Sequence, residues 1–167
     1  MSTTQPTPSA DSARQLFRHS LAVLAYRGGK AIRNAPPTFA TFRVSETSRT
    51  PLEILAHIGD LLVWAISIAR GEQKWSNSKG ESWEKESARF HAELTNFDNL
   101  LASGAPIHES FEKLMQGPVA DALTHVGQLT MLRRAAGCPI RGENYHRANI
   151  TAGVVGPDQP PANREFD

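Results

Sequence analysis

The sequence predicts an all-α fold, a four-helix bundle followed by an irregular C-terminal extension. Four segments carry apolar residues every three or four positions, which is the period of an amphipathic helix. Connections of different lengths separate these segments, and no run of alternating strand residues appears between them. The chain has 167 residues, of which 40% are hydrophobic and 21% charged, so we expect one globular domain.

Composition suggests three regions and a cytoplasmic setting. Residues 1–10 are rich in Ser, Thr and Pro and are predicted to be disordered, 11–137 form the bundle, and 138–167 form an extended segment packing on it. The net charge is +1 without a Lys/Arg run, which argues against nucleic-acid and membrane partners. The first residues lack the apolar core of a secretory signal, and the longest apolar stretch, at 61–69, is too short to span a bilayer. A single cysteine, Cys138, excludes an internal disulfide.

The first predicted helix starts at Ser12, because Ser12 and Gln15 have the spacing of a capping box. Leu16 belongs to its predicted apolar face, and Pro36-Pro37 end it. Residues 36–49 are predicted to be a connecting loop.

The second and third helices have clear start signals. Thr50-Pro51 with Glu53 combines an N-cap, a proline at the first helical position and a capping box, and Gly71 is a stop signal. The third helix is expected from Ser82 to Ser103. Its predicted solvated face is Glu84, Lys85, Arg89 and Glu93.

The last helix is expected in two parts. A short helical turn is predicted between Glu109 and Gln116, and Gly117-Pro118 is expected to break or restart the chain. The fourth main helix then runs to about Ala136, with Gly137 as its cap.

Three polar residues on two of these helices form a candidate metal site. The spacing of the second helix directs His57 toward the core, and Asp121 and His125 lie one turn apart on the fourth helix. Such a pair, completed by His57, offers three ligands and open positions for water or substrate. Each residue also has a structural interpretation: His57 as a hydrogen-bonded core histidine, Asp121 as a carboxylate favoured near a helix start, and the pair as a plain hydrogen bond.

Further residues are candidates for the surroundings of this site. Gln128, one turn after His125, either orients a ligand or is a buried amide bonded to a neighbouring helix. Trp64 shares the stripe of His57 and is either core or pocket wall. In 141–149, Tyr145 and His146 either line a pocket over the open end of the bundle or belong to a solvated loop, which we favour. His146 is the reserve ligand. The remaining histidines, His19, His91 and His108, are expected at the surface or on helix flanks.

LEILAHIGDLLVWA at 52–65 and ALTHVGQLTMLRRAAGCP at 122–139 resemble the DinB-like (YfiT-like) four-helix-bundle metalloproteins. That family typically uses three histidines, one on the second helix and two on the last, where His57 and His125 match and Asp121 replaces the middle one. The resemblance covers roughly residues 12–137. It implies a divalent ion, zinc or nickel, and a thiol-dependent transferase that joins a low-molecular-weight thiol to a small-molecule substrate.

Two functions therefore stay open. One is a metal-dependent enzyme, a transferase or hydrolase, that activates a thiol or water. The other is a non-catalytic bundle, a binding or dimerisation protein associated with stress response, whose polar core residues only hydrogen-bond. A homodimer is expected for either function.

Overall fold

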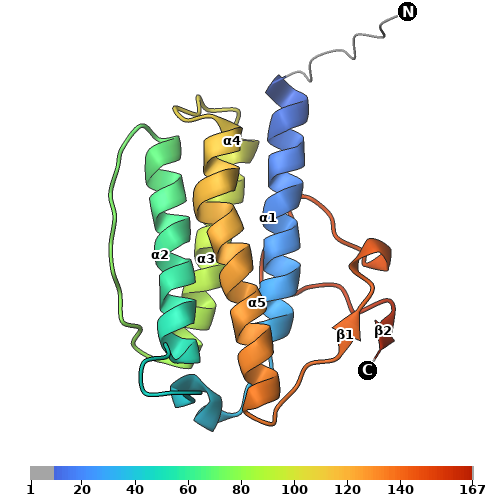
Figure 1. Ribbon diagram of the computed structural model, residues 1–167. Coiled ribbons are helices and arrows are strands. Elements are labelled where there is room, and N and C mark those ends of the chain that lie inside the picture. Colours follow the sequence, from blue (N-terminus) through green and yellow to red (C-terminus); the bar gives the residue numbers. More distant parts are fainter. Residues whose placement is uncertain (1–9, 167) are drawn as a thin grey trace, which may run out of the picture.

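A computed structural model describes residues 10–166 and confirms the all-α bundle with an irregular C-terminal segment (Figure 1). Helix α1 pairs with α3 and α5, and α2 also packs against α3 and α5, so that α1 and α2 lie at diagonal corners. The long helices are α1 (Ala10–Ile32), α2 (Pro51–Ala69), α3 (Trp83–Ala102) and α5 (Ala120–Ala135).

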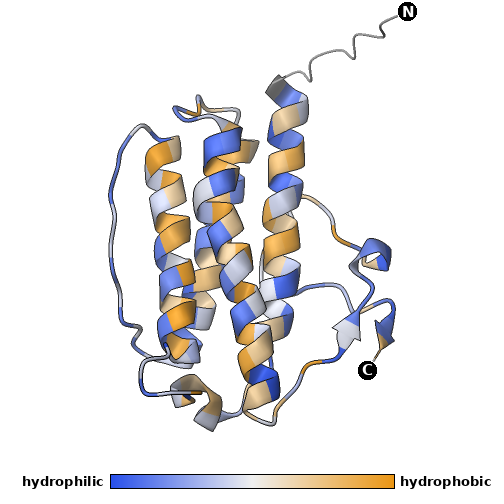
Figure 2. Ribbon diagram, in the orientation of Figure 1, coloured by the Kyte–Doolittle hydropathy of each residue, from blue (hydrophilic) through white to orange (hydrophobic). Residues whose placement is uncertain are grey.

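Apolar residues recur along each long helix (Figure 2) and meet in one core. Helix α2 contributes most to it, and by length and composition alone it would also suffice to cross a membrane. However, 67% of its apolar window is buried inside the bundle, as in the core helix of a soluble protein. The expectation that no apolar segment is long enough to cross a membrane is corrected by the length of α2.

The predicted starts of α2 and α3 are confirmed. The Thr50 hydroxyl accepts from the Glu53 backbone N–H at 3.2 Å, and the Glu53 carboxylate accepts from the Thr50 N–H at 2.7 Å. This reciprocal pair is a capping box, which satisfies backbone donors that the first turn leaves free. At α3, the Ser82 hydroxyl accepts from the Lys85 N–H.

The prediction for α1 is wrong in two details. The helix already includes Ala10, so Ser12 lies inside it rather than at its start, and the predicted disorder of 1–10 otherwise concerns residues outside the described part of the chain. Leu16 is 69% exposed, because the inward stripe passes through Phe17 and Leu21 instead. The predicted loop after α1 also contains a short 3-10 helix, Pro37–Thr41, that buries Phe39.

The predicted break at Gly117-Pro118 is also wrong, because one continuous helix runs from α4 (Phe111–Leu114) through α5. Residues Met115–Val119 form a π-turn between them, with Pro118 buried inside it. Proline removes a backbone donor and crowds the preceding turn of an α-helix. The wider π-turn accommodates such local irregularity without ending the helix.

Helices α2 and α3 run in parallel, so the 70–82 connection crosses the length of the bundle along α2 (Figure 1). Asp60, fully buried on α2, holds this crossover by accepting from the Ser78 N–H at 2.6 Å and from the Ser76 and Ser78 hydroxyls. Arg89 donates to the same carboxylate at 2.9 Å. The expectation that Arg89 lies on a purely solvated face is therefore wrong.

The C-terminal segment lies beside α1 and contains a two-stranded antiparallel sheet (Figure 1). Strand β1 (Gly142–Glu143) pairs with β2 (Glu165–Phe166), and a 3-10 helix, Tyr145–Arg147, follows β1. The buried Glu143 carboxylate accepts from the Tyr26 hydroxyl at 2.7 Å and from Lys30 Nζ at 2.8 Å. Lys30 also pairs with Glu165 at 2.7 Å.

Candidate metal centre

His57 of α2 and Asp121 and His125 of α5 come together on the face where these helices pack. Their donor atoms all lie within 4.8 Å of one another. The two imidazole rings contact each other edge-on, with their centroids 4.7 Å apart. Asp121 approaches both, with Oδ2 3.6 Å from His57 Nε2 and Oδ1 3.4 Å from His125 Nε2. Two imidazoles and one carboxylate form a donor set that binds divalent transition metals, so this group can hold a metal ion.

The spacing of these atoms is compatible with a shared ion. Side-chain hydrogen bonds normally join atoms about 2.7–3.2 Å apart, so 3.4 and 3.6 Å are too long for strong ones. Ligands about 2.0–2.1 Å from a tetrahedral ion are about 3.3 Å from each other. The two nitrogen–oxygen distances fit that edge length.

The continuous last helix also removes the structural explanation for Asp121. A carboxylate is stabilised near a helix start because the first backbone N–H groups are free. Here, however, helical turns from Phe111 onward precede Asp121, and the Ala120 N–H is already bonded to preceding carbonyl oxygens. Asp121 therefore does not cap a free helix start, and it is 46% exposed beside the two histidines.

Gln128 fixes the ring of His125. Its Oε1 lies 2.8 Å from His125 Nδ1, and because an amide oxygen only accepts, Nδ1 carries the proton. The lone pair of His125 is then on Nε2, the nitrogen that faces Asp121. Metal-binding histidines are commonly oriented in this way by a hydrogen bond to the other ring nitrogen.

The environment of His57 favours its neutral form. Burial lowers the pKa of His57, and the nearby His125 and the positive charge of Arg49 lower it further, while the Asp121 carboxylate opposes the decrease. A neutral imidazole is the form that binds metal ions.

A pocket of about 370 Å³ adjoins the cluster. His125 and Gln128 form one of its walls, Ile54, Met131 and Leu132 give it an apolar surface, and Arg49 adds a positive charge. No carboxylate of the described residues forms an ion pair with Arg49. The pocket is large enough for a small molecule next to the cluster.

Trp75 is a neighbour of the cluster that the sequence did not reveal. Its ring stands edge-on to His57 at 5.8 Å and to Trp64 at 5.6 Å, and the side chain is 51% exposed. Trp64 thus borders the site through Trp75. Because Trp75 belongs to the crossover, its position depends on the non-local contacts of Asp60, for which the sequence gives no periodic signal.

The structure does not bring Tyr145 and His146 into the cluster. Tyr145 packs edge-on against Tyr26 at 6.3 Å and under the Arg27 guanidinium at 4.4 Å. His146 is exposed and does not join the group of donor atoms, so its role as reserve ligand finds no support. His19 and His108 are exposed as expected, whereas His91 is buried, which corrects its prediction as a surface residue.

Fold and site together define an all-α helical bundle with a His-Asp-His group that can hold a metal ion. Comparisons with family models, with curated proteins and with solved structures found no match to this chain. The resemblance to the DinB-like proteins therefore stays a prediction.

Proposed function

We propose that the protein is a divalent-metal-dependent enzyme whose ion is held by His57, Asp121 and His125. One observation carries the proposal: two imidazoles and a carboxylate converge at distances too long for direct hydrogen bonds and suited to a common ion. Three protein ligands leave coordination positions open, which distinguishes catalytic from structural sites.

Zinc or nickel in this group would supply a Lewis acid that lowers the pKa of a water or thiol bound to it. The residues around it have separate tasks. Gln128 keeps the Nε2 lone pair of His125 directed at the site, and burial keeps His57 neutral. Arg49 favours a substrate with a negative group in the adjoining pocket, whose apolar residues would contact the rest of such a substrate.

The thiol part of the proposal rests on the resemblance to the DinB-like proteins. A low-molecular-weight thiol would enter as co-substrate, lose its proton and attack an electrophilic carbon, so that a carbon–sulfur bond forms as the leaving group departs with its electron pair. We expect this activity in the cytoplasm, where such thiols stay reduced, and in a homodimer.

Metal binding is tested by equilibrium dialysis of the chelator-treated protein against zinc and nickel, followed by elemental analysis. The variants His57→Ala, Asp121→Ala and His125→Ala are compared with His19→Ala, which removes an exposed histidine of α1. We expect about one ion per chain in the parent and in His19→Ala, and a loss in the three site variants. Equal binding by all five proteins, or none by the parent, would overturn the proposal.

Activity is tested on the metal-loaded protein with cysteine as thiol and chlorodinitrobenzene as electrophile. Chloride release that depends on the ion and is lost in His125→Ala would support the transferase. Stoichiometric metal without turnover of this or hydrolysable ester substrates would favour the non-catalytic bundle.

A further inference from the structure

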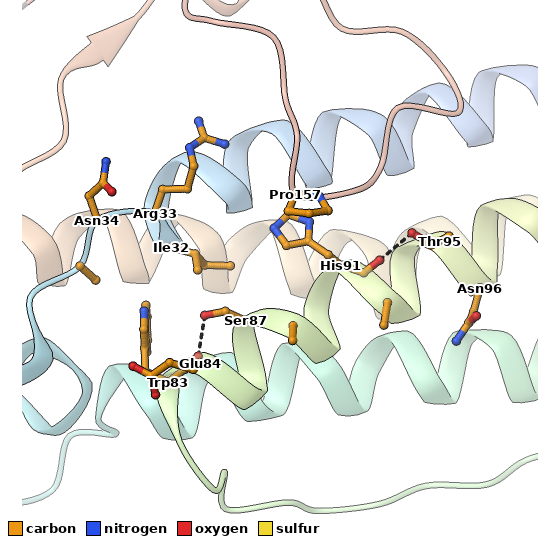
Figure 3. Close-up of a pocket in the computed structure, with 13 residues that line it drawn as sticks. Ile32, Arg33, Asn34, Trp83, Glu84, Ser87, His91, Thr95, Asn96 and Pro157 are labelled. Carbon is orange, nitrogen blue, oxygen red and sulfur yellow. Dashed lines mark hydrogen bonds between the residues drawn. The ribbon is translucent and has the colours of Figure 1, made fainter.

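A solvent-open cavity of about 750 Å³ lies away from the metal cluster (Figure 3). It opens between the end of α1, the first half of α3 and the C-terminal segment near Pro157. Since α1 and α2 occupy diagonal corners of the bundle, the α1–α3 face is opposite the α2–α5 face that carries the cluster. The proposed metal chemistry therefore leaves this cavity without a role.

The C-terminal segment builds one wall of the cavity. Val155 is buried against the core, and Gln159 holds the turn around it by donating to the carbonyl oxygens of Val154 and Gly156. Pro157 completes the wall beside His91 (Figure 3). These bonds hold the turn that carries Pro157.

His91 places a hydrogen-bond acceptor in this cavity. The side chain is only 8% exposed, and its Nδ1 lies 3.3 Å from the Val155 carbonyl oxygen. At this length the contact is a weak hydrogen bond, and because a carbonyl oxygen can only accept, Nδ1 is its donor. In the neutral ring, Nε2 then keeps the lone pair. Nε2 has no hydrogen-bond partner among the described residues.

Nε2 of His91 can remain without a hydrogen-bond partner in the protein because it reaches solvent through the cavity. None of the side-chain nitrogen or oxygen atoms that are fully buried in the described residues lacks a hydrogen bond, so Nε2 is not sealed off. His91 lines the cavity, which is its route to water. A ligand that displaces this water must donate a hydrogen bond to Nε2, because a buried polar atom without a hydrogen bond weakens binding.

The other lining groups define the charge and shape of the ligand. Arg33 and Glu84, both exposed, line the cavity without an ion pair to another described residue, so its lining carries one positive and one negative charge. Most remaining surface is apolar, and the Trp83 ring is steadied by an edge contact with Phe39 at 5.3 Å. Aromatic walls with few polar groups suit a flat, uncharged ligand.

We infer that this cavity binds a small, neutral aromatic molecule whose hydroxyl or ring N–H donates to His91 Nε2. The proposal concerns a second site and is independent of metal binding. Phenols and indoles carry the required combination of a flat apolar body and one donor.

The test compares para-cresol with its methyl ether, para-methylanisole, on the metal-free protein. The ether keeps the aromatic body and lacks the donor. By ligand-observed NMR titration we expect para-cresol to bind about fivefold more tightly, the usual value of one net hydrogen bond. Benzoate and benzylammonium, which carry opposite charges, should both bind more weakly than para-cresol.

The variant His91→Asn removes the Nε2 acceptor while it keeps a donor for the Val155 carbonyl oxygen. The asparagine amide can replace Nδ1–H at the Val155 carbonyl, whereas nothing replaces Nε2. In His91→Asn we expect the affinity for para-cresol to fall to that for para-methylanisole. In His19→Asn we expect the preference for para-cresol over the ether to stay unchanged. In the unmodified protein, para-cresol but not the ether should move the nitrogen NMR signal of His91 Nε2, a readout that does not depend on the stability of the variant. Equal affinities of the two ligands, no binding of either, or an unmoved His91 signal would overturn the inference.

Discussion

The polar clusters around Glu143 and around Asp121 differ in how well their atoms satisfy one another. Around Glu143, the Tyr26 hydroxyl and Lys30 Nζ make contacts of 2.7 and 2.8 Å, and the carboxylate side chain is fully buried. Around Asp121, the nearest imidazole nitrogens are 3.4 and 3.6 Å away, and the carboxylate is half-exposed. Each cluster joins a helix of the bundle to a distant part of the chain.

The difference separates a closed hydrogen-bonded network from a group that could hold a metal ion. Short contacts to both carboxylate oxygens of Glu143 fasten the C-terminal segment to α1. The longer contacts around Asp121 leave that carboxylate without a short hydrogen bond to either imidazole. Changes to the first cluster should therefore lower stability, and changes to the second should lower metal binding.

The largest effect is expected from Lys30→Met. Removing this ammonium leaves the Glu143 carboxylate buried without its cation, so the free energy of unfolding should fall by about 3 kcal/mol. Urea unfolding measures it. Lys85→Met, which removes an exposed lysine paired with Glu81, is the matched control and should cost less than about 0.5 kcal/mol. Similar losses in both variants would show that the buried network is not special.

The same network predicts a loss of stability at high pH. Burial alone would lower the pKa of Lys30, but its bonds to Glu143 and Glu165 raise it, and burial with the Glu143 hydrogen bond raises the pKa of Tyr26. Groups whose pKa is raised by folding stabilise fully below their unfolded values and lose that contribution as the pH rises past them. As the pH rises above about 10, where unfolded tyrosine and lysine side chains lose their protons, the free energy of unfolding should therefore decrease.

Glu143 works in the opposite direction. Burial would raise its pKa, but the hydrogen bonds from Lys30 and Tyr26 outweigh burial and lower it, so its contribution is present above the unfolded pKa and lost in acid. A pH series on Lys30→Met should show a flatter curve at both ends. An unchanged curve would mean that the titrating groups lie elsewhere.

A smaller effect on a different quantity is expected from Gln128→Ala. The alanine side chain has no amide oxygen, so the N–H at Nδ1 of His125 loses its hydrogen-bond acceptor. The imidazole ring then loses its fixed orientation. Metal affinity should drop about 10- to 100-fold, the usual cost of removing such a supporting residue. Zinc titration against a competing chelator measures it, with Thr124→Ala, an exposed position on the same helix, as the control. An affinity equal to that control would contradict the positioning role.

The smallest change in stability is expected from Asp121→Asn in the metal-free protein. Half-exposed ion pairs with long contacts contribute about 0–1 kcal/mol, so unfolding should hardly change. Metal binding should nevertheless be lost, because the amide lacks the charge of the carboxylate ligand. A stability loss comparable to Lys30→Met would make Asp121 a structural residue and end the contrast between the clusters.

Local signals made part of this structure predictable. The capping box of Thr50 and Glu53, the Ser82 cap and the one-turn spacing of Asp121 and His125 depend on neighbours within four residues. Their positions followed from helical geometry. The contact of Gln128 with His125 is equally local. His57 required only the direction of one helical stripe.

Contacts between distant segments were not predictable. His91 is buried because the segment around Val155 covers it, and Trp75 reaches His57 because Asp60 holds the crossover. Neither relation leaves a period or a motif in the sequence. The continuity through Pro118 was missed for another reason: proline usually ends a helix, and only the surrounding packing shows that a π-turn absorbs it.

That π-turn also sets the rotational phase of the last helix. A π-turn amounts to one inserted residue in an α-helix, and each residue of an α-helix turns the following chain by about 100°. Leu114 before the insertion and Val126 after it both face the core, while His125 faces α2. Deleting one residue from Met115–Val119 would restore an uninterrupted α-helix, in which the two halves could no longer both keep these directions. The π-turn thus rotates the second part of the helix relative to the first. As a result, the first part packs into the core and the middle of the helix presents its candidate ligands to α2.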